Sequence, residues 1–247
     1  MELGLKGRVA IVCGSSSGIG LAVAEALTEE GANVAMLARR RDVLEREAER
    51  LGALAVRGDV RDPRDLDNLV DRTLEAFGGV DIVVNNSGGP PRGTARAADA
   101  PALEEAVELL LLSAVRLTLS CLPHLERSGH GRVITIASSS VREPIENLAL
   151  SNAVRPGVVG WMKTLAREVG PSGITVNSIA TGQIDTARVR ERYPEGPNEQ
   201  DLHPIPLRRL GTTREIGDVV AFLASDRAAY VTGTLIPVDG GLTRGLL

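Results

Sequence analysis

The chain has 247 residues, enough for one large α/β domain or two small ones. Its formal net charge is −4 with no long run of either sign, which argues against a charge-driven nucleic-acid or membrane surface. No uninterrupted run of about 18 apolar residues occurs, and the first residues lack the apolar core of a signal peptide. We therefore expect a cytoplasmic globular protein that binds a small molecule, with no membrane or nucleic-acid partner.

Cysteine and histidine usage gives no sign of a metal site. Cys13 and Cys121 lie within apolar segments, as buried thiols of cytosolic proteins do. His124, His130 and His203 are scattered without metal-ligand spacing, and we expect them at the surface.

Short apolar runs alternate with longer amphipathic segments along the chain. The runs that predict strands are 9–13, 34–37, 54–57, 82–85, 132–137, 175–179 and 235–238. Helices are expected near 18–30, 41–51, 63–77, 101–127, 153–169 and 213–225. This alternation predicts a single α/β domain over residues 1–247, with a parallel sheet of about seven strands and helices on both faces.

The segment 185–206 interrupts the alternation and is rich in charged residues and proline. Irregular segments of this length within a domain are usually functional or mobile. We expect a lid over a substrate cleft; the alternative is an inert insertion.

A glycine-rich turn follows the first predicted strand and opens the first predicted helix. Glycines permit a tight turn and let a pyrophosphate approach the backbone, and the helix N-terminus carries partial positive charge toward the phosphates. The residues of this predicted cradle are Gly14, Ser16, Ser17, Gly18, Ile19 and Gly20. This context favours a dinucleotide site in a doubly wound, Rossmann-type sheet over a turn with a structural role alone.

The end of the second predicted strand bears on the choice of dinucleotide. An acidic residue here would bind the ribose hydroxyls of NAD, but Ala38 has no carboxylate. Arg39 can instead pair with a 2′-phosphate, so NADP(H) is favoured over NAD(H). The alternative is that the arginines 39–41 only form the solvated start of a helix.

Short motifs follow the later predicted strands in order. They are Asp59-Val60, Asn85-Asn86-Ser87-Gly88, the segments 134–138 and 177–182, and the C-terminal segment 231–241. Together with the glycine-rich turn, they make the chain resemble the short-chain dehydrogenase/reductase family over its full length. The resemblance is nearest to 3-oxoacyl-(acyl-carrier-protein) reductases and related carbonyl reductases.

The resemblance implies roles for several residues. Asp59 and Val60 would contact the adenine, and Asn86 would lie along the adenosine. Ile184 and Thr186 would meet the nicotinamide carboxamide. It also implies a carbonyl or acyl substrate and a homotetramer, with the helices after the fourth and fifth strands packed between subunits.

Catalysis in this family uses a serine, a tyrosine, a lysine four residues after the tyrosine, and an asparagine in the preceding helix. Ser138 matches the serine. Ser151 stands at the tyrosine position, thirteen residues later, and Arg155 at the lysine position. Counting back from Pro123 assigns Leu111 to the asparagine position.

These substitutions change the chemistry that the site offers. A tyrosine hydroxyl has a pKa near 10, whereas an alkanol such as Ser151 is far less acidic. Arg155 can bind ribose hydroxyls but is not a proton relay. Leu111 cannot hold a water molecule. We therefore expect an atypical active site.

Other roles for these residues are also consistent with the sequence. Ser151 is a good N-cap for a helix that starts late, with Pro156 in its first turn. Tyr193, in the predicted lid, is an alternative proton donor, whereas Tyr230 suits a packing role. Lys163 lies two turns beyond the lysine position and is expected on the outer part of the helix.

Two hypotheses about function follow. The first is an NADP(H)-dependent oxidoreductase with weak or altered activity on a carbonyl or alcohol. The second is a catalytically silent homologue that binds a dinucleotide and has a regulatory or partner-subunit role.

Overall fold

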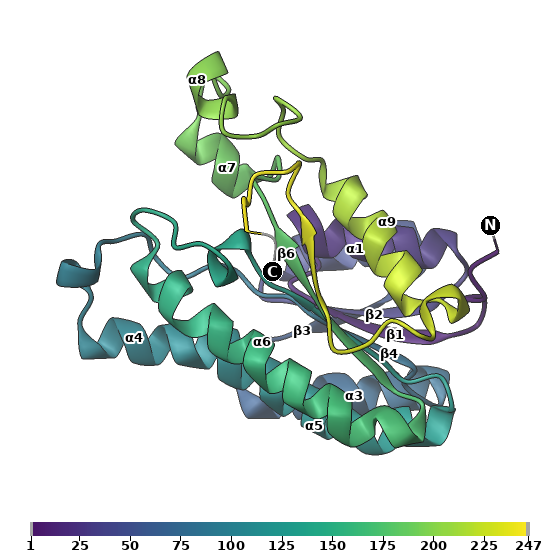
Figure 1. Ribbon diagram of the computed structural model, residues 1–247. Coiled ribbons are helices and arrows are strands. Elements are labelled where there is room, and N and C mark those ends of the chain that lie inside the picture. Colours follow the sequence, from purple (N-terminus) through teal and green to yellow (C-terminus); the bar gives the residue numbers. More distant parts are fainter. Residues whose placement is uncertain (1, 246–247) are drawn as a thin grey trace.

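A computed structural model describes residues 2–245 and has a seven-stranded sheet at its centre (Figure 1). The strands are β1 (Val9–Cys13), β2 (Asn33–Ala38), β3 (Leu54–Arg57), β4 (Ile82–Asn85), β5 (Arg132–Ile136), β6 (Thr175–Thr181) and β7 (Leu235–Val238). Every neighbouring pair is parallel, in the order β3-β2-β1-β4-β5-β6-β7. The predicted doubly wound sheet is confirmed. Strand order reverses between β1 and β4, which is where such sheets bind ligands.

Three helices cover one face of the sheet (Figure 1). They are α1 (Gly18–Glu29), α2 (Arg41–Leu51) and α9 (Thr213–Ala224). Helices α1 and α9 pack closely because Gly217 has no side chain: a Cβ there would lie 2.6 Å from the carbonyl oxygen of Ala22. Leu27 and Val220 are fully buried in this layer.

The other face is covered by α3 (Pro63–Phe77), α4 (Ala100–Val107), α5 (Ser113–Ser128) and α6 (Ala149–Val169). The predicted helix 101–127 is therefore two α-helices, joined by a π-helical segment, Glu108–Leu112. Helix α6 begins at Ala149, earlier than predicted. The side-chain amide of Asn152 donates to and accepts from the backbone of Ile145, which fastens this early first turn.

Short helical turns complete the fold. They are Ala95–Ala97, Ser139–Val141, Gly170–Ser172 and Asp226–Ala228. The segment expected to be a lid contains α7 (Ala187–Arg192) and α8 (Glu199–Leu202), which stand above the end of β6 (Figure 1). Its movement over a cleft stays a prediction.

The helical run Ala100–Ser128 reaches a mean hydropathy of 1.6, so by length and composition alone it could cross a membrane. The sequence, which has no uninterrupted run of about 18 apolar residues, predicts no such segment. Leu110, Leu117 and Leu125 of this run are buried in the core beside the sheet. Core helices of soluble proteins can have the same length and mean hydropathy.

The expected surface position of His130 is wrong. Its imidazole is buried, with Nε2 2.9 Å from the carbonyl oxygen of Ala224 and Nδ1 2.9 Å from Asp226. Both partners come from a distant part of the chain, so local sequence does not reveal them. Cys13 and Cys121 are buried as predicted, and burial raises the pKa of the Cys13 thiol to about 12.

The packing of α1 on α9 gives a test of the fold. Gly217→Ala should lower the free energy of unfolding by about 1–3 kcal/mol, because the new methyl group meets backbone. Gly160→Ala, in α6 with open space around it, should leave it unchanged or raise it by up to about 1 kcal/mol. Urea denaturation measures both; an unchanged midpoint for Gly217→Ala would contradict the tight packing.

Candidate active site

The predicted site residues gather at the carboxyl ends of the strands, around the point where strand order reverses. The glycine turn joins β1 to α1 there, Asn86 follows β4, and Ser138 follows β5. Thr186 lies beyond β6, at the start of α7. The structure thus brings together loops from four strands.

The glycine turn has the geometry of a phosphate cradle. Gly14 and Gly18 both have a φ of 60°, which is the left-handed region that favours glycine. A Cβ at Gly20 would overlap the carbonyl oxygen of Gly14. Ser17 precedes α1 but its side chain does not cap the helix, so the first amides face the cleft free of a side-chain acceptor.

Side chains around the turn hold its shape. The Asn86 side-chain amide donates to the carbonyl oxygen of Cys13 at 3.0 Å, so this residue fastens the turn to the loop after β4. Ser16 is buried and Ile19 half-buried behind the turn. Thr186 also lies close to the glycine turn, because a Cβ at Gly18 would lie 3.6 Å from the methyl group of Thr186.

Basic side chains flank the expected adenosine end. Arg39 is exposed and lies 4.0 Å from Asp59, two residues that were expected to share this end. The Arg61 guanidinium lowers the pKa of the Asp59 carboxyl by hydrogen bonding to it. Arg40 donates to Ser17 Oγ at 2.9 Å, so it faces the glycine turn more directly than Arg39. From the sequence, Arg40 is expected only as part of the solvated start of a helix.

The expected contact of Ile184 with the nicotinamide carboxamide stays a prediction. The Ile184 side chain is buried among the core residues of the α1 and α9 layer, and its backbone forms a bridge to Gly211. Ile184 and Pro237 line a cavity of about 240 Å³.

Three serines connect β5 to α6. Ser138 Oγ accepts a hydrogen bond from the backbone N–H of Ser140 at 3.2 Å. The hydroxyl of Ser140 lies 3.1 Å from that of Ser151, which is buried in the first turn of α6. Ser151 is therefore not an N-cap, because the helix begins two residues earlier and Pro156 lies beyond its first turn.

Arg155 lies one turn beyond Ser151. Its Nη1 donates to the carbonyl oxygen of Ile136 at 3.1 Å, whereas its buried Nε has no hydrogen-bond partner within residues 2–245. Burial, and then the charge of Arg188, lowers the pKa of Arg155 to about 10. The guanidinium therefore stays charged at neutral pH.

Two cavities adjoin these groups. The smaller one, of about 20 Å³, lies beside Arg155 and the unpartnered Asn85 Oδ1, and it has room for one water molecule. Leu110 lines it, whereas Leu111, assigned from sequence to the asparagine position, does not. The π-helical segment shifts which leucine faces inward. The larger cavity, of about 700 Å³, is lined by Ser138.

The remaining candidates lie apart from this cleft. Tyr193 stacks under the Arg192 guanidinium, 4.8 Å from the ring centre, and lines a separate depression with Pro194. Tyr230 is fully exposed, contrary to the expected packing role. Lys163 donates to the carbonyl oxygen of Gly233 on the outer part of α6, as predicted. Within residues 2–245, no cluster of three histidine, cysteine or acidic side chains could hold a metal ion.

Comparison with known proteins agrees with this geometry. Residues 14–243 match the family model described as enoyl-(acyl carrier protein) reductase. The 3-oxoacyl-(acyl-carrier-protein) reductase FabG of Escherichia coli is 36% identical over 244 residues, which cover 97% of this chain and 99% of the relative.

Solved structures resemble it over the full fold. L-sorbose reductase of Gluconobacter frateurii, complexed with NADPH and L-sorbose, is 32% identical with a TM-score of 0.94 and full coverage of both chains. An NADPH-bound short-chain oxidoreductase of Pseudomonas aeruginosa, described as containing an atypical catalytic centre, is 32% identical with a TM-score of 0.92. That match covers 98% of this chain and 99% of the other. The chain belongs to the short-chain dehydrogenase/reductase family, close to the 3-oxoacyl-(acyl-carrier-protein) reductases.

Proposed function

We propose that this protein is an NADP(H)-dependent oxidoreductase that acts on a carbonyl or alcohol group of a small molecule without a tyrosine proton donor. The observation that carries the proposal is the phosphate cradle at the point where strand order reverses, next to a cleft that Ser138 lines. The NADPH complexes of related reductases support the choice of cofactor.

The cofactor fits the groups present. Gly14, Gly18 and the free amides of α1 suit a pyrophosphate, and Arg39 and Arg40 suit a 2′-phosphate. Ribose hydroxyls would give the unpartnered donor of Arg155 an acceptor. Bound NADPH supplies the hydride for carbonyl reduction.

The protein's own residues would polarise the substrate oxygen. Ser138 accepts the Ser140 N–H, which leaves its hydroxyl proton to donate to that oxygen. The fixed charge of Arg155 favours negative charge that develops nearby. Ser151 would act through Ser140, as a positioning group. Loss of a general acid typically costs about 100- to 10,000-fold in rate, so we expect weak or altered activity.

One observation favours the alternative, a catalytically silent dinucleotide-binding homologue with a regulatory or partner-subunit role. Ser151 is buried, and its hydroxyl is hydrogen-bonded to that of Ser140, so this hydroxyl is not free to act as an acid. Leu110 and Leu111 both lack a polar group that could hold a water molecule.

We also propose a cytoplasmic homotetramer in which α5 and α6 pack between subunits. Half-exposed apolar side chains such as Trp161 lie on these helices. In this assembly the apolar run Ala100–Ser128 would bury its outer face against protein.

Cofactor binding and turnover together test the proposal. We expect NADPH to bind in a fluorescence titration, and to be oxidised slowly with at least one member of a panel of ketones, 3-oxoacyl thioesters and quinones. Turnover above about 1 per second, the low end of typical enzyme rates, would exclude the silent homologue. Failure of both NADPH and NADH to bind at millimolar concentration would overturn the reductase proposal.

The basic side chains at the adenosine end should set cofactor choice. Arg40→Gln should weaken NADPH binding by about 10- to 100-fold and leave NADH binding unchanged, because a charge-assisted bond to the 2′-phosphate is lost. Arg41→Gln is the matched control, since Arg41 pairs with Glu45 on the outside of α2. Equal losses for the two cofactors would contradict this role.

Restoring the family residues at two positions should not restore an ordinary rate. Ser151→Tyr with Arg155→Lys should stay at least about 100-fold below the median enzyme rate, because Leu110 offers no polar side chain to hold a water molecule in a proton path. Adding Leu110→Asn should raise the rate further, whereas Leu111→Asn should not. Steady-state NADPH oxidation measures the rates of all three variants. An ordinary rate in the double variant would contradict the expectation.

A further inference from the structure

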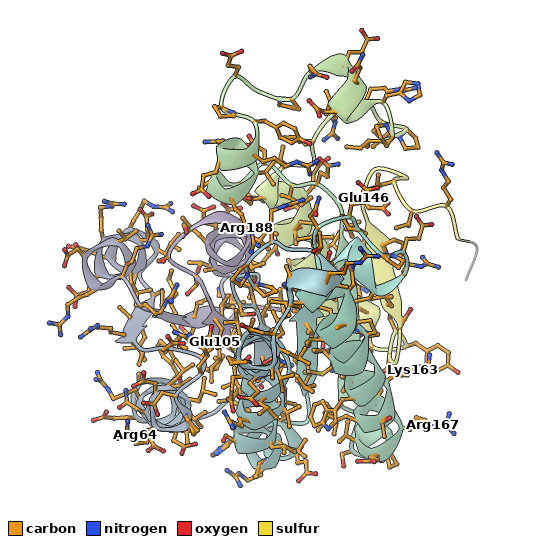
Figure 2. All side chains as sticks on the ribbon, turned by 90° about the vertical axis from the view of Figure 1, so that its left-hand side faces the viewer. Arg64, Glu105, Glu146, Lys163, Arg167 and Arg188 are labelled. Carbon is orange, nitrogen blue, oxygen red and sulfur yellow. The ribbon has the colours of Figure 1, made fainter. Side chains whose placement is uncertain are left out.

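The large cavity beside Ser138 contains three arginines. Arg92 comes from the loop after β4, and Arg188 and Arg192 come from α7. Figure 2 shows Arg188 on the side of the molecule where the α7–α8 segment rises, far from the outward-pointing Lys163 and Arg167. Two acidic residues, Glu143 and Glu191, also line the cavity.

The acids do not neutralise these arginines. Within residues 2–245, none of the three arginines forms an ion pair. One Glu143 oxygen accepts the backbone N–H groups of Arg244 and Gly245, at 2.7 and 3.2 Å. Glu191 is exposed. By contrast Arg190, on the same short helix, pairs with Asp185 at 2.8 Å.

Neutral groups hold the cavity arginines in place. Arg188 donates to the carbonyl oxygen of Pro90 at 2.7 Å, and Arg92 reaches that of Glu146 at 3.5 Å. The Arg188 guanidinium lies against Gly89, where any side chain would overlap it. These two contacts hold Arg188 and Arg92, whereas the Arg192 guanidinium lies over the Tyr193 ring. All three arginines are exposed, and no carboxylate within the described residues pairs with them.

Arg155 lines the neighbouring small cavity, not the one that Arg188 lines. Its pKa is lowered first by burial and then by the charge of Arg188. An anion bound at Arg188 would offset this like-charge repulsion. Arginine pairs with carboxylate in a two-bonded, planar geometry.

From these contacts we infer that the substrate is an oxo acid: a carbonyl compound whose carboxylate binds Arg188, with Arg92 and Arg192 beside it, while its carbonyl oxygen meets Ser138. This inference rests on the proposed function and names its substrate class. A pyrophosphate of the cofactor is the other anion that Arg188 could meet, because Thr186 adjoins the glycine turn.

Matched pairs of ligands test the inference on the full chain saturated with NADP⁺. Isothermal titration compares 2-oxobutanoate, 3-oxobutanoate and 4-oxopentanoate with their methyl esters. We expect at least one acid to bind about tenfold or more tightly than its ester, because a charge-assisted bond is worth about that factor. Arg188→Gln should abolish this preference, Arg188→Lys should keep part of it, and Arg190→Gln should leave it unchanged.

Each contrary outcome has a distinct meaning. Esters that bind as well as every acid, or no binding of any acid at 10 mM (roughly the limit of a specific site), overturn the substrate class. Loss of NADPH affinity in Arg188→Gln with the acid preference intact assigns Arg188 to the cofactor and overturns it too. If neutral ketones are reduced and acids are not preferred, the substrate class is wrong but the proposed oxidoreductase function holds. If NADPH does not bind, the proposed oxidoreductase function itself is wrong.

Discussion

The hydrogen bond from Arg155 to the carbonyl oxygen of Ile136 fixes the centre of the site. It joins the first turns of α6 to the last residue of β5, so the helix brings its charge to the carboxyl edge of the sheet. A buried guanidinium has five donors and needs acceptors for them. The buried Nε of Arg155 has no hydrogen-bond partner within the described residues, and Arg155 also lines the small cavity.

The same anchor limits what chemistry the site can perform. A lysine at this position could lower the pKa of a neighbouring hydroxyl and exchange a proton, whereas a guanidinium supplies only a fixed charge and donors. Ser151 is tied to Ser140, and Ser140 in turn donates its N–H to Ser138. The three serines and Arg155 therefore make a rigid, polar wall, in which Ser138 alone faces the large cavity.

Strands and most helices were predictable because apolar, β-branched runs and helical periodicity are local signals. The π-helical segment was not, since four consecutive leucines do not indicate which one faces inward. The sequence therefore points to Leu111, whereas Leu110 lines the cavity. The start of α6 also escaped prediction, because it depends on Asn152 binding the backbone of Ile145.

Side chains that reach the site from far along the chain were also missed. Arg188 lies within a segment that the sequence marks only as charged, and its contact with Pro90 spans 98 residues. That contact ties the base of the α7–α8 segment to the loop after β4, while Thr186 rests on the glycine turn. The α7–α8 segment thus contacts the same loops that form the cofactor cradle. A substitution of Arg188 can therefore change the binding of the cofactor or of the substrate. To separate the two effects, the affinity for each ligand has to be measured with the other ligand bound.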